Sequence, residues 1–125
     1  MSNDLGFFAT LMAKQFLSRR HYVEFDAAAK AQGAPGLDID TQTRDGRRVI
    51  AEIKTTVPYL GTDFGAQQAT SIKKDIVKLN SASADYKYFF VTDASAFKAL
   101  KAKRYLVSTV GIRIVLLTTG EEHAG

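Results

Sequence analysis

The stretch from Gly36 to Thr56, GLDIDTQTRDGRRVIAEIKTT, constrains the fold more than any other part of the chain. Apolar and polar residues alternate from Leu37 to Thr43, and the residues from Val49 to Thr55 are rich in β-branched side chains. Between these two segments, Arg44-Asp45-Gly46-Arg47 supplies the residue types that favour a tight turn. The pattern therefore predicts a β-hairpin.

Helical and extended patterns alternate on both sides of this hairpin. The first helix is expected to face the core with an apolar stripe at helical spacing, formed by Leu5, Phe8, Leu11, Met12, Phe16 and Leu17. Further helices are predicted over about 65–79 and 94–103, buried strands over 88–92 and 112–117, and a short strand over 22–25. We expect residues 1–117 to form a single domain and residues 118–125 to form a flexible tail.

The composition fits one compact soluble domain of 125 residues, since 46% of the residues are hydrophobic and 24% are charged. Lys and Arg number 17 against 13 Asp and Glu, and the resulting net charge of +4 favours a polyanionic partner. Cysteine is absent, which excludes disulfides, thiolate metal sites and cysteine nucleophiles. No secretion signal or membrane segment is recognisable, so we expect a cytoplasmic protein.

The alternation of side chains along a strand places charged residues of the hairpin on shared faces. Asp38 and Asp40 share one face of the first strand, and Glu52 and Lys54 share one face of the second. If these faces coincide, carboxylates that repel one another converge, and such a cluster predicts a bound cation. Oxygen ligands favour Mg²⁺ or Mn²⁺, with Ca²⁺ as an inert substitute. The alternative is that Glu52 and Lys54 form only a solvated ion pair on an edge strand.

The motif GLD, which ends at Asp38, is followed fourteen residues later by EIK, which is Glu52-Ile53-Lys54. Together with the order of the predicted elements, this motif resembles the PD-(D/E)XK nuclease superfamily of restriction endonucleases and junction resolvases. The resemblance covers roughly Asp4 to Leu117 and implies an α/β fold with a restriction endonuclease-like core. That core is a central mixed β-sheet flanked by helices in the order αβββαβ. Two departures are Leu37 in place of the usual proline and the lack of a glutamate on the first helix, which some members carry.

The resemblance also implies roles for individual residues. Asp38, Glu52 and the backbone carbonyl of Ile53 would hold Mg²⁺, with Mn²⁺ as a substitute, and Lys54 would lie beside the attacking water. Phosphodiester hydrolysis needs a hydroxide near neutral pH and charge stabilisation at phosphorus, and a divalent ion supplies both. Asp40 is expected to be a supporting acid or an alternative ligand. Gln68, at the start of the second helix, would contact the metal site or the substrate, unless it simply faces solvent.

The expected function is that of a metal-dependent endodeoxyribonuclease that hydrolyses DNA phosphodiester bonds. Lys73, Lys74 and Lys78 on the second helix would contact DNA phosphates, although lysines on such helices are often only solvated. Cutting both strands needs two active sites, so we expect a homodimer, or a subunit of a larger nuclease complex. The strand over 112–117 or the stripe of the first helix would supply the interface. There are two alternatives. One is a structure-selective nuclease resembling a junction resolvase, and the other is a non-catalytic nucleic-acid or protein-binding domain of the same fold.

Overall fold

A mixed five-stranded sheet, with strands in the order β1-β2-β3-β4-β5, forms the middle layer of the structure. This computed structural model describes residues 2–21, 37–59, 61, 63–102 and 109–124. The strands are β1 (Ile39–Gln42), β2 (Arg48–Lys54), β3 (Tyr86–Val91), β4 (Arg113–Leu116) and β5 (Glu121–Ala124). The three central strands are parallel, and both edge strands are antiparallel to their neighbours. The expected α/β class with a mixed central sheet is confirmed.

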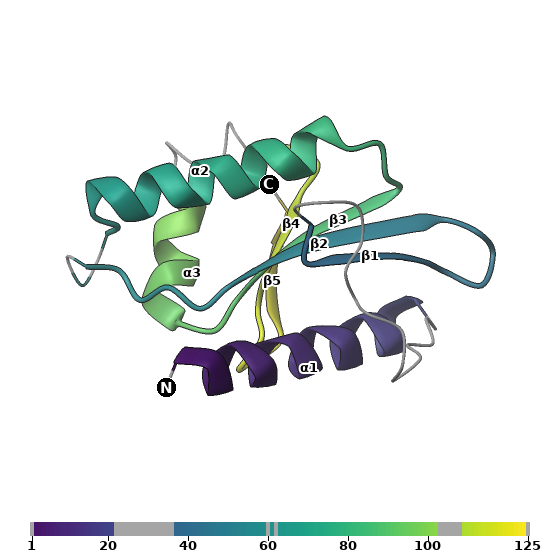
Figure 1. Cartoon of the computed structure of the whole chain (residues 1–125), viewed down its shortest axis with the longest axis horizontal. Coiled ribbons are helices and arrows are strands. Elements are labelled where there is room, and N and C mark those ends of the chain that lie inside the picture. Colours follow the sequence, from purple (N-terminus) through teal and green to yellow (C-terminus); the bar gives the residue numbers. More distant parts are fainter. Residues whose placement is uncertain (1, 22–36, 60, 62, 103–108, 125) are drawn as a thin grey trace.

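Helices cover both faces of this sheet (Figure 1). Helix α1 (Ser2–His21) lies on one face, and helices α2 (Ala66–Ser81) and α3 (Ala94–Lys101) lie on the other. The described residues thus give the order αββαβαββ, and the predicted strand over 22–25 lies outside them. None of the helices described here is long and apolar enough to cross a membrane.

The predicted hairpin is confirmed as β1 and β2, which pair in antiparallel register with Ile39 opposite Ala51. The turn closes with a hydrogen bond of 2.8 Å from the Thr43 amide to the Arg47 carbonyl. Gly46 adopts a φ of 85°, a left-handed conformation that residues with a Cβ rarely take. Because β2 then leads through α2 into the parallel strand β3, the hairpin is fixed to the middle of the sheet.

Two apolar layers hold the sheet between the helices, and they follow the two-residue period of the strands. Ile50, Phe89 and Ile114 point towards α2 and α3, where they are buried in one cluster. Ala51 and Phe90 point the other way and pack in a second cluster with residues of α1. Full burial of an isoleucine or phenylalanine side chain contributes about 1.5–3 kcal/mol to stability, so the two layers together fix the sheet between its helices.

The predicted core stripe of α1 is wrong for its first half. Leu5, Phe8 and Leu11 are exposed to 44%, 60% and 40%, whereas Ala9 and Ala13 are fully buried. The helix is apolar on more than one side, so its sequence does not determine which side packs. The small side chains of the two alanines allow the helix backbone to approach a sheet face that carries large aromatic rings. Towards its carboxyl end the predicted stripe does reach the core, where Leu17 is buried and Phe16 packs against the same cluster.

The expected tail is also a misassignment, because residues 121–124 form β5 and pair with β4. Gly120, with a φ of 82°, makes the turn that reverses the chain between the two strands. Strand β4 is therefore hydrogen-bonded on both sides, and its residues Ile114, Val115 and Leu116 are buried. It cannot serve as the dimer interface that its apolar sequence suggested.

Candidate active site

Asp38 and Glu52 lie side by side across the hairpin. Because Ile39 pairs with Ala51, the residue that precedes β1 is opposite Glu52. The Asp38 amide donates a hydrogen bond of 2.8 Å to Glu52 Oε2, and the Ile53 amide donates one of 2.8 Å to Asp38 Oδ2. The structure thus brings together the two acids that the alternation of the hairpin predicted.

Glu52 is a buried carboxylate whose side chain is only 2% exposed. Its second oxygen, Oε1, lies 2.7 Å from Lys78 Nζ. Burial raises the pKa of Glu52 to about 7, although the hydrogen bonds from Lys78 and from the Asp38 amide both act to lower it. Asp38 beside it is exposed to solvent.

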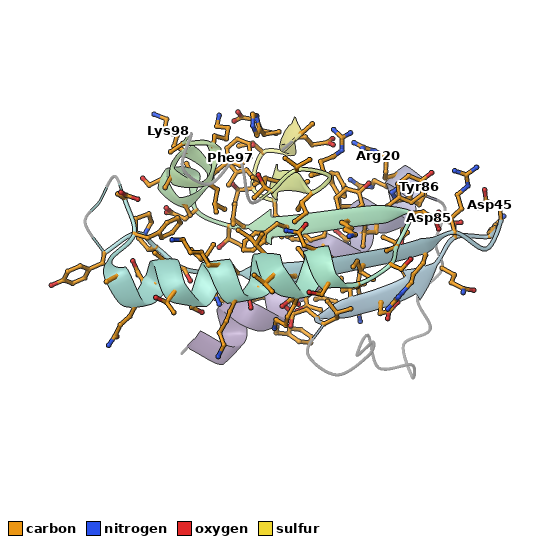
Figure 2. The ribbon with its side chains drawn as sticks, turned by 90° about the horizontal axis from the view of Figure 1, so that it is seen from above. Arg20, Asp45, Asp85, Tyr86, Phe97 and Lys98 are labelled. Atoms are coloured by element: carbon orange, nitrogen blue, oxygen red, sulfur yellow. The ribbon has the colours of Figure 1, made fainter. Side chains whose placement is uncertain are left out.

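Lys54 extends from the end of β2 towards α2, on the same face of the strand as Glu52. Its ammonium lies 2.8 Å from Asp75 Oδ2 and donates a hydrogen bond of 2.7 Å to Ser71 Oγ. Two polar groups of one helix thus fix the position of this ammonium. Figure 2 shows Asp45 of the hairpin turn and Asp85 before β3 at one end of the molecule. Since β2 begins beside that turn and ends at Lys54, the site lies away from this end.

One polar stripe of α2 serves this whole region. The stripe consists of Gln68, Ser71, Asp75 and Lys78, which follow one another at intervals of three and four residues. Asp75 lies between the two lysines, at 2.8 Å from Lys54 and 3.2 Å from Lys78. Sequence reasoning missed Ser71 and Asp75. The available signal was that both lie at helical spacing beside the buried residues Ile72, Ile76 and Leu79.

Gln68 braces the loop that follows β2. Its side-chain oxygen accepts hydrogen bonds from the Tyr59 amide at 2.8 Å and the Gly65 amide at 3.0 Å. Its amide nitrogen donates one of 2.8 Å to the Val57 carbonyl. These three contacts are with the backbone of the loop and with the start of α2 rather than with Asp38 or Glu52, and the role of Gln68 towards a substrate stays a prediction. Tyr59, whose amide is held in this way, is 80% exposed.

The other predicted residues lie outside the cluster or play a different part in it. Asp40 shares the face of Asp38, but Arg48 binds both of its oxygens, at 3.0 Å and 2.6 Å. Lys73 and Lys74 are exposed on the outer side of α2, as a phosphate-binding role requires. Lys78, which was grouped with them, turns instead towards Glu52.

The donor chemistry of the cluster fits a hard divalent cation. Asp38 and Glu52 supply adjacent carboxylates, and the Ile53 amide faces the start of β1. In an extended strand the carbonyl of a residue points to the same side as its amide, so the Ile53 carbonyl faces the same way. Within the described ranges, no group of three or more His, Cys, Asp or Glu side chains is placed to hold a metal ion. A cation here would therefore depend on two carboxylates and a main-chain oxygen.

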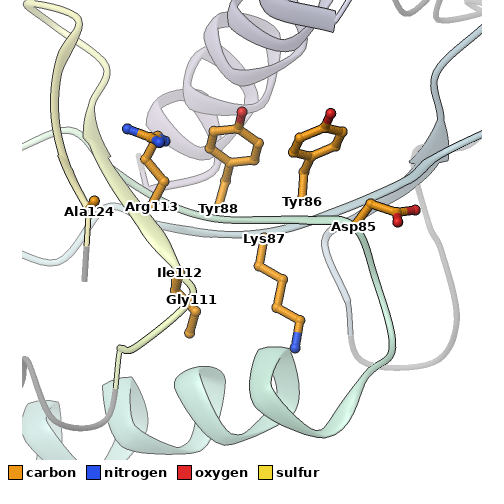
Figure 3. Close-up of a pocket in the computed structure, with 8 residues that line it drawn as sticks. All are labelled: Asp85, Tyr86, Lys87, Tyr88, Gly111, Ile112, Arg113 and Ala124. Carbon is orange, nitrogen blue, oxygen red and sulfur yellow. The ribbon is translucent and has the colours of Figure 1, made fainter.

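A separate hollow of about 220 Å³ lies near the amino ends of β3 and β4 (Figure 3). Tyr86, Tyr88 and Arg113 point to one side of the sheet there, and Lys87 points to the other side, towards α2. The Tyr88 hydroxyl lies 2.6 Å from His21 Nε2 at the end of α1. This hollow shares no lining residue with the cluster around Glu52.

Comparisons with models of protein families, with curated proteins and with solved structures gave no match to this chain.

Proposed function

We propose that this chain is a metal-dependent endodeoxyribonuclease of the PD-(D/E)XK kind. The observation that carries the proposal is the placement of three residues: Asp38 lies opposite Glu52 across the hairpin, and Lys54 follows two residues later on the same face. The order of the elements next to the site supports the proposal as well, because α2 links β2 to the parallel strand β3.

In this proposal Asp38, Glu52 and the Ile53 carbonyl hold Mg²⁺ or Mn²⁺. The bound ion supplies a hydroxide near neutral pH and stabilises negative charge on the phosphate. Lys54 adds a positive charge that Ser71 and Asp75 hold in a fixed position, so it can orient the attacking water and balance the charge of the transition state. The products would carry 5′-phosphate and 3′-hydroxyl ends, as the resemblance implies.

DNA is the proposed substrate, and the net charge of +4 is consistent with a polyanion. Lys73 and Lys74, which face solvent on α2, are the proposed phosphate contacts. Two sites are needed to cut two strands, so we propose a homodimer, with a subunit of a larger nuclease complex as the other arrangement. The exposed apolar residues in the first half of α1 are the proposed contact surface between copies.

A non-catalytic nucleic-acid-binding domain of the same fold is the second candidate. One observation favours it: Glu52 and Lys54 both make short contacts with charged residues of α2. If these pairs are permanent, the cluster stabilises the fold and does no chemistry.

The test is to incubate the purified protein with supercoiled, linear and branched DNA in Mg²⁺, in Mn²⁺ and in EDTA. We expect cleavage that needs the metal and falls at least about 100-fold in Asp38→Asn, Glu52→Gln and Lys54→Ala. Lys98→Ala, which removes an exposed lysine of α3, is the matched control and should cleave normally. Cleavage in EDTA would exclude the metal mechanism, and DNA binding without cleavage in any condition would establish the second candidate.

A further inference from the structure

The Lys78 ammonium lies against Glu52, which is one of the two carboxylates proposed to bind the metal ion. Glu52 is 2% exposed, whereas the Lys78 side chain that contacts it is 41% exposed. Lys78 is in the last turn of α2, so its long side chain reaches from the helix surface down to the carboxylate. The side chain of Lys78 is therefore in contact with solvent, while its ammonium covers the buried carboxylate of Glu52.

A buried carboxylate needs a compensating charge, since an isolated one is strongly unfavourable away from water. In the described structure Lys78 provides that charge at 2.7 Å, and it also lies 3.2 Å from Asp75. Lys54 differs, because it contacts Ser71 and Asp75, both on α2. Of these two lysines, Lys78 is the one that contacts a proposed metal ligand.

Building on the proposed nuclease function, we propose that Lys78 is the resident counter-ion of Glu52, which a divalent ion displaces. The ammonium lies 2.7 Å from Glu52 Oε1. A divalent ion held by Asp38 and Glu52 would repel an ammonium at that distance, because two cations on one carboxylate interact unfavourably. The flexible stem of lysine lets the ammonium move into water, or remain on Asp75 alone, without a change in the backbone.

As the counter-ion of Glu52, Lys78 has a measurable effect on ion binding. A lysine that only contacted DNA phosphates would have no such effect. Binding of the ion and binding of the ammonium to Glu52 compete, so removal of the ammonium should tighten binding of the ion. A residue that only positioned Glu52 would have the opposite effect, since its loss would weaken binding of the ion.

The experiment is calorimetric titration of the metal-free protein with Ca²⁺ and with Mn²⁺ at pH 8.5, without DNA. The variants are Lys78→Met and Lys78→Gln, the latter keeping a hydrogen-bond donor in case the former does not fold. Lys74→Met is the matched control, because it removes the same charge from an exposed position on the same helix. Asp38→Asn tests whether the titrated ion binds at the proposed site.

We expect both Lys78 variants to lower the Kd for the ions at least about fivefold, within the usual range of coupling between sites. Lys74→Met should leave the Kd unchanged, and Asp38→Asn should raise it. In EDTA the Lys78 variants should melt at lower temperature than the wild type, and saturating Ca²⁺ should reduce that difference.

An unchanged or higher Kd in both Lys78 variants, with normal binding by the wild type, would overturn the counter-ion assignment and leave the nuclease proposal standing. Absence of binding in the wild type and in every variant would overturn both. The two proposals can therefore fail separately.

Discussion

Glu52 is the residue whose environment has the clearest consequence for stability. Its pKa rises to about 7 in the folded protein, from 4.5 in an unperturbed chain, mainly because it is buried. Between these two values the folded state binds the proton more tightly than the unfolded state does, so stability falls as the pH rises through this window. Below the window both states are protonated, and above it both are ionised.

We therefore expect the metal-free wild type to lose about 1–3 kcal/mol of unfolding free energy between pH 4.5 and pH 7 through this residue. Other groups also titrate in this range, so the measured quantity is the difference between the wild type and Glu52→Gln. Urea denaturation of both proteins in EDTA, at pH 5 and at pH 8, provides it. Two proteins with the same change between these pH values would show that Glu52 titrates normally.

The sequence predicted Asp38, Glu52 and Lys54 because all three follow from the period of a strand and from one short turn. It did not predict Asp75 or the inward direction of Lys78. Polar residues lie on both sides of the apolar stripe of α2, and only packing of the helix against the sheet decides which side meets the strands. Binding of a metal ion, binding of DNA and cleavage of the phosphodiester bond remain predictions.

At the scale of elements, one side chain of α2 makes several hydrogen bonds to the loop after β2. Gln68 makes three hydrogen bonds to the loop backbone, at Val57, Tyr59 and Gly65. We expect Gln68→Ala to destabilise the loop by about 1–3 kcal/mol, because the backbone groups lose their partner. Amide hydrogen exchange at Tyr59 and Gly65 should accelerate, while exchange in β3 should change little.

The matched control for this prediction is Gln67→Ala, which truncates the exposed neighbouring glutamine. It should leave exchange at both amides as in the wild type. Equal protection of the two amides in Gln68→Ala and Gln67→Ala would mean that the loop is held by other contacts.

The elements that sequence reasoning found and missed differ in how local their determinants are. The hairpin was predictable because its turn chemistry and its alternation lie within one short segment. Strand β5 has the sequence EEHA, which shows no apolar alternation, and it becomes a strand because the edge of β4 supplies hydrogen-bond partners. The rotation of α1 likewise depends on the aromatic face of the sheet, which no local pattern of the helix records.

For the whole molecule, the exposed apolar residues of α1 lead to a prediction about assembly. Phe7 and Phe8 are both exposed and in edge-to-face contact, with ring centroids 6.2 Å apart. If this surface joins two copies, the double variant Phe7→Ser/Phe8→Ser should raise the dimer Kd at least about tenfold, since large aromatic residues commonly dominate interfaces. Sedimentation velocity at micromolar concentration would measure the change.

Val77→Ser is the control for the assembly prediction, because it removes an exposed apolar side chain from α2. It should leave the sedimentation coefficient unchanged. A wild type that stays monomeric both alone and on DNA would exclude the dimer and favour a subunit of a larger complex.

The single polar stripe of α2 also makes the site sensitive to insertions and deletions. Each residue of a helix advances it by about 100° of rotation, so one residue added or lost between Gln68 and Lys78 would turn part of the stripe away from the sheet. Gln68 would then no longer face the loop after β2 while Asp75 and Lys78 face Lys54 and Glu52. Substitutions along this helix can be tested one contact at a time, whereas a change in its length would separate these contacts in a single step.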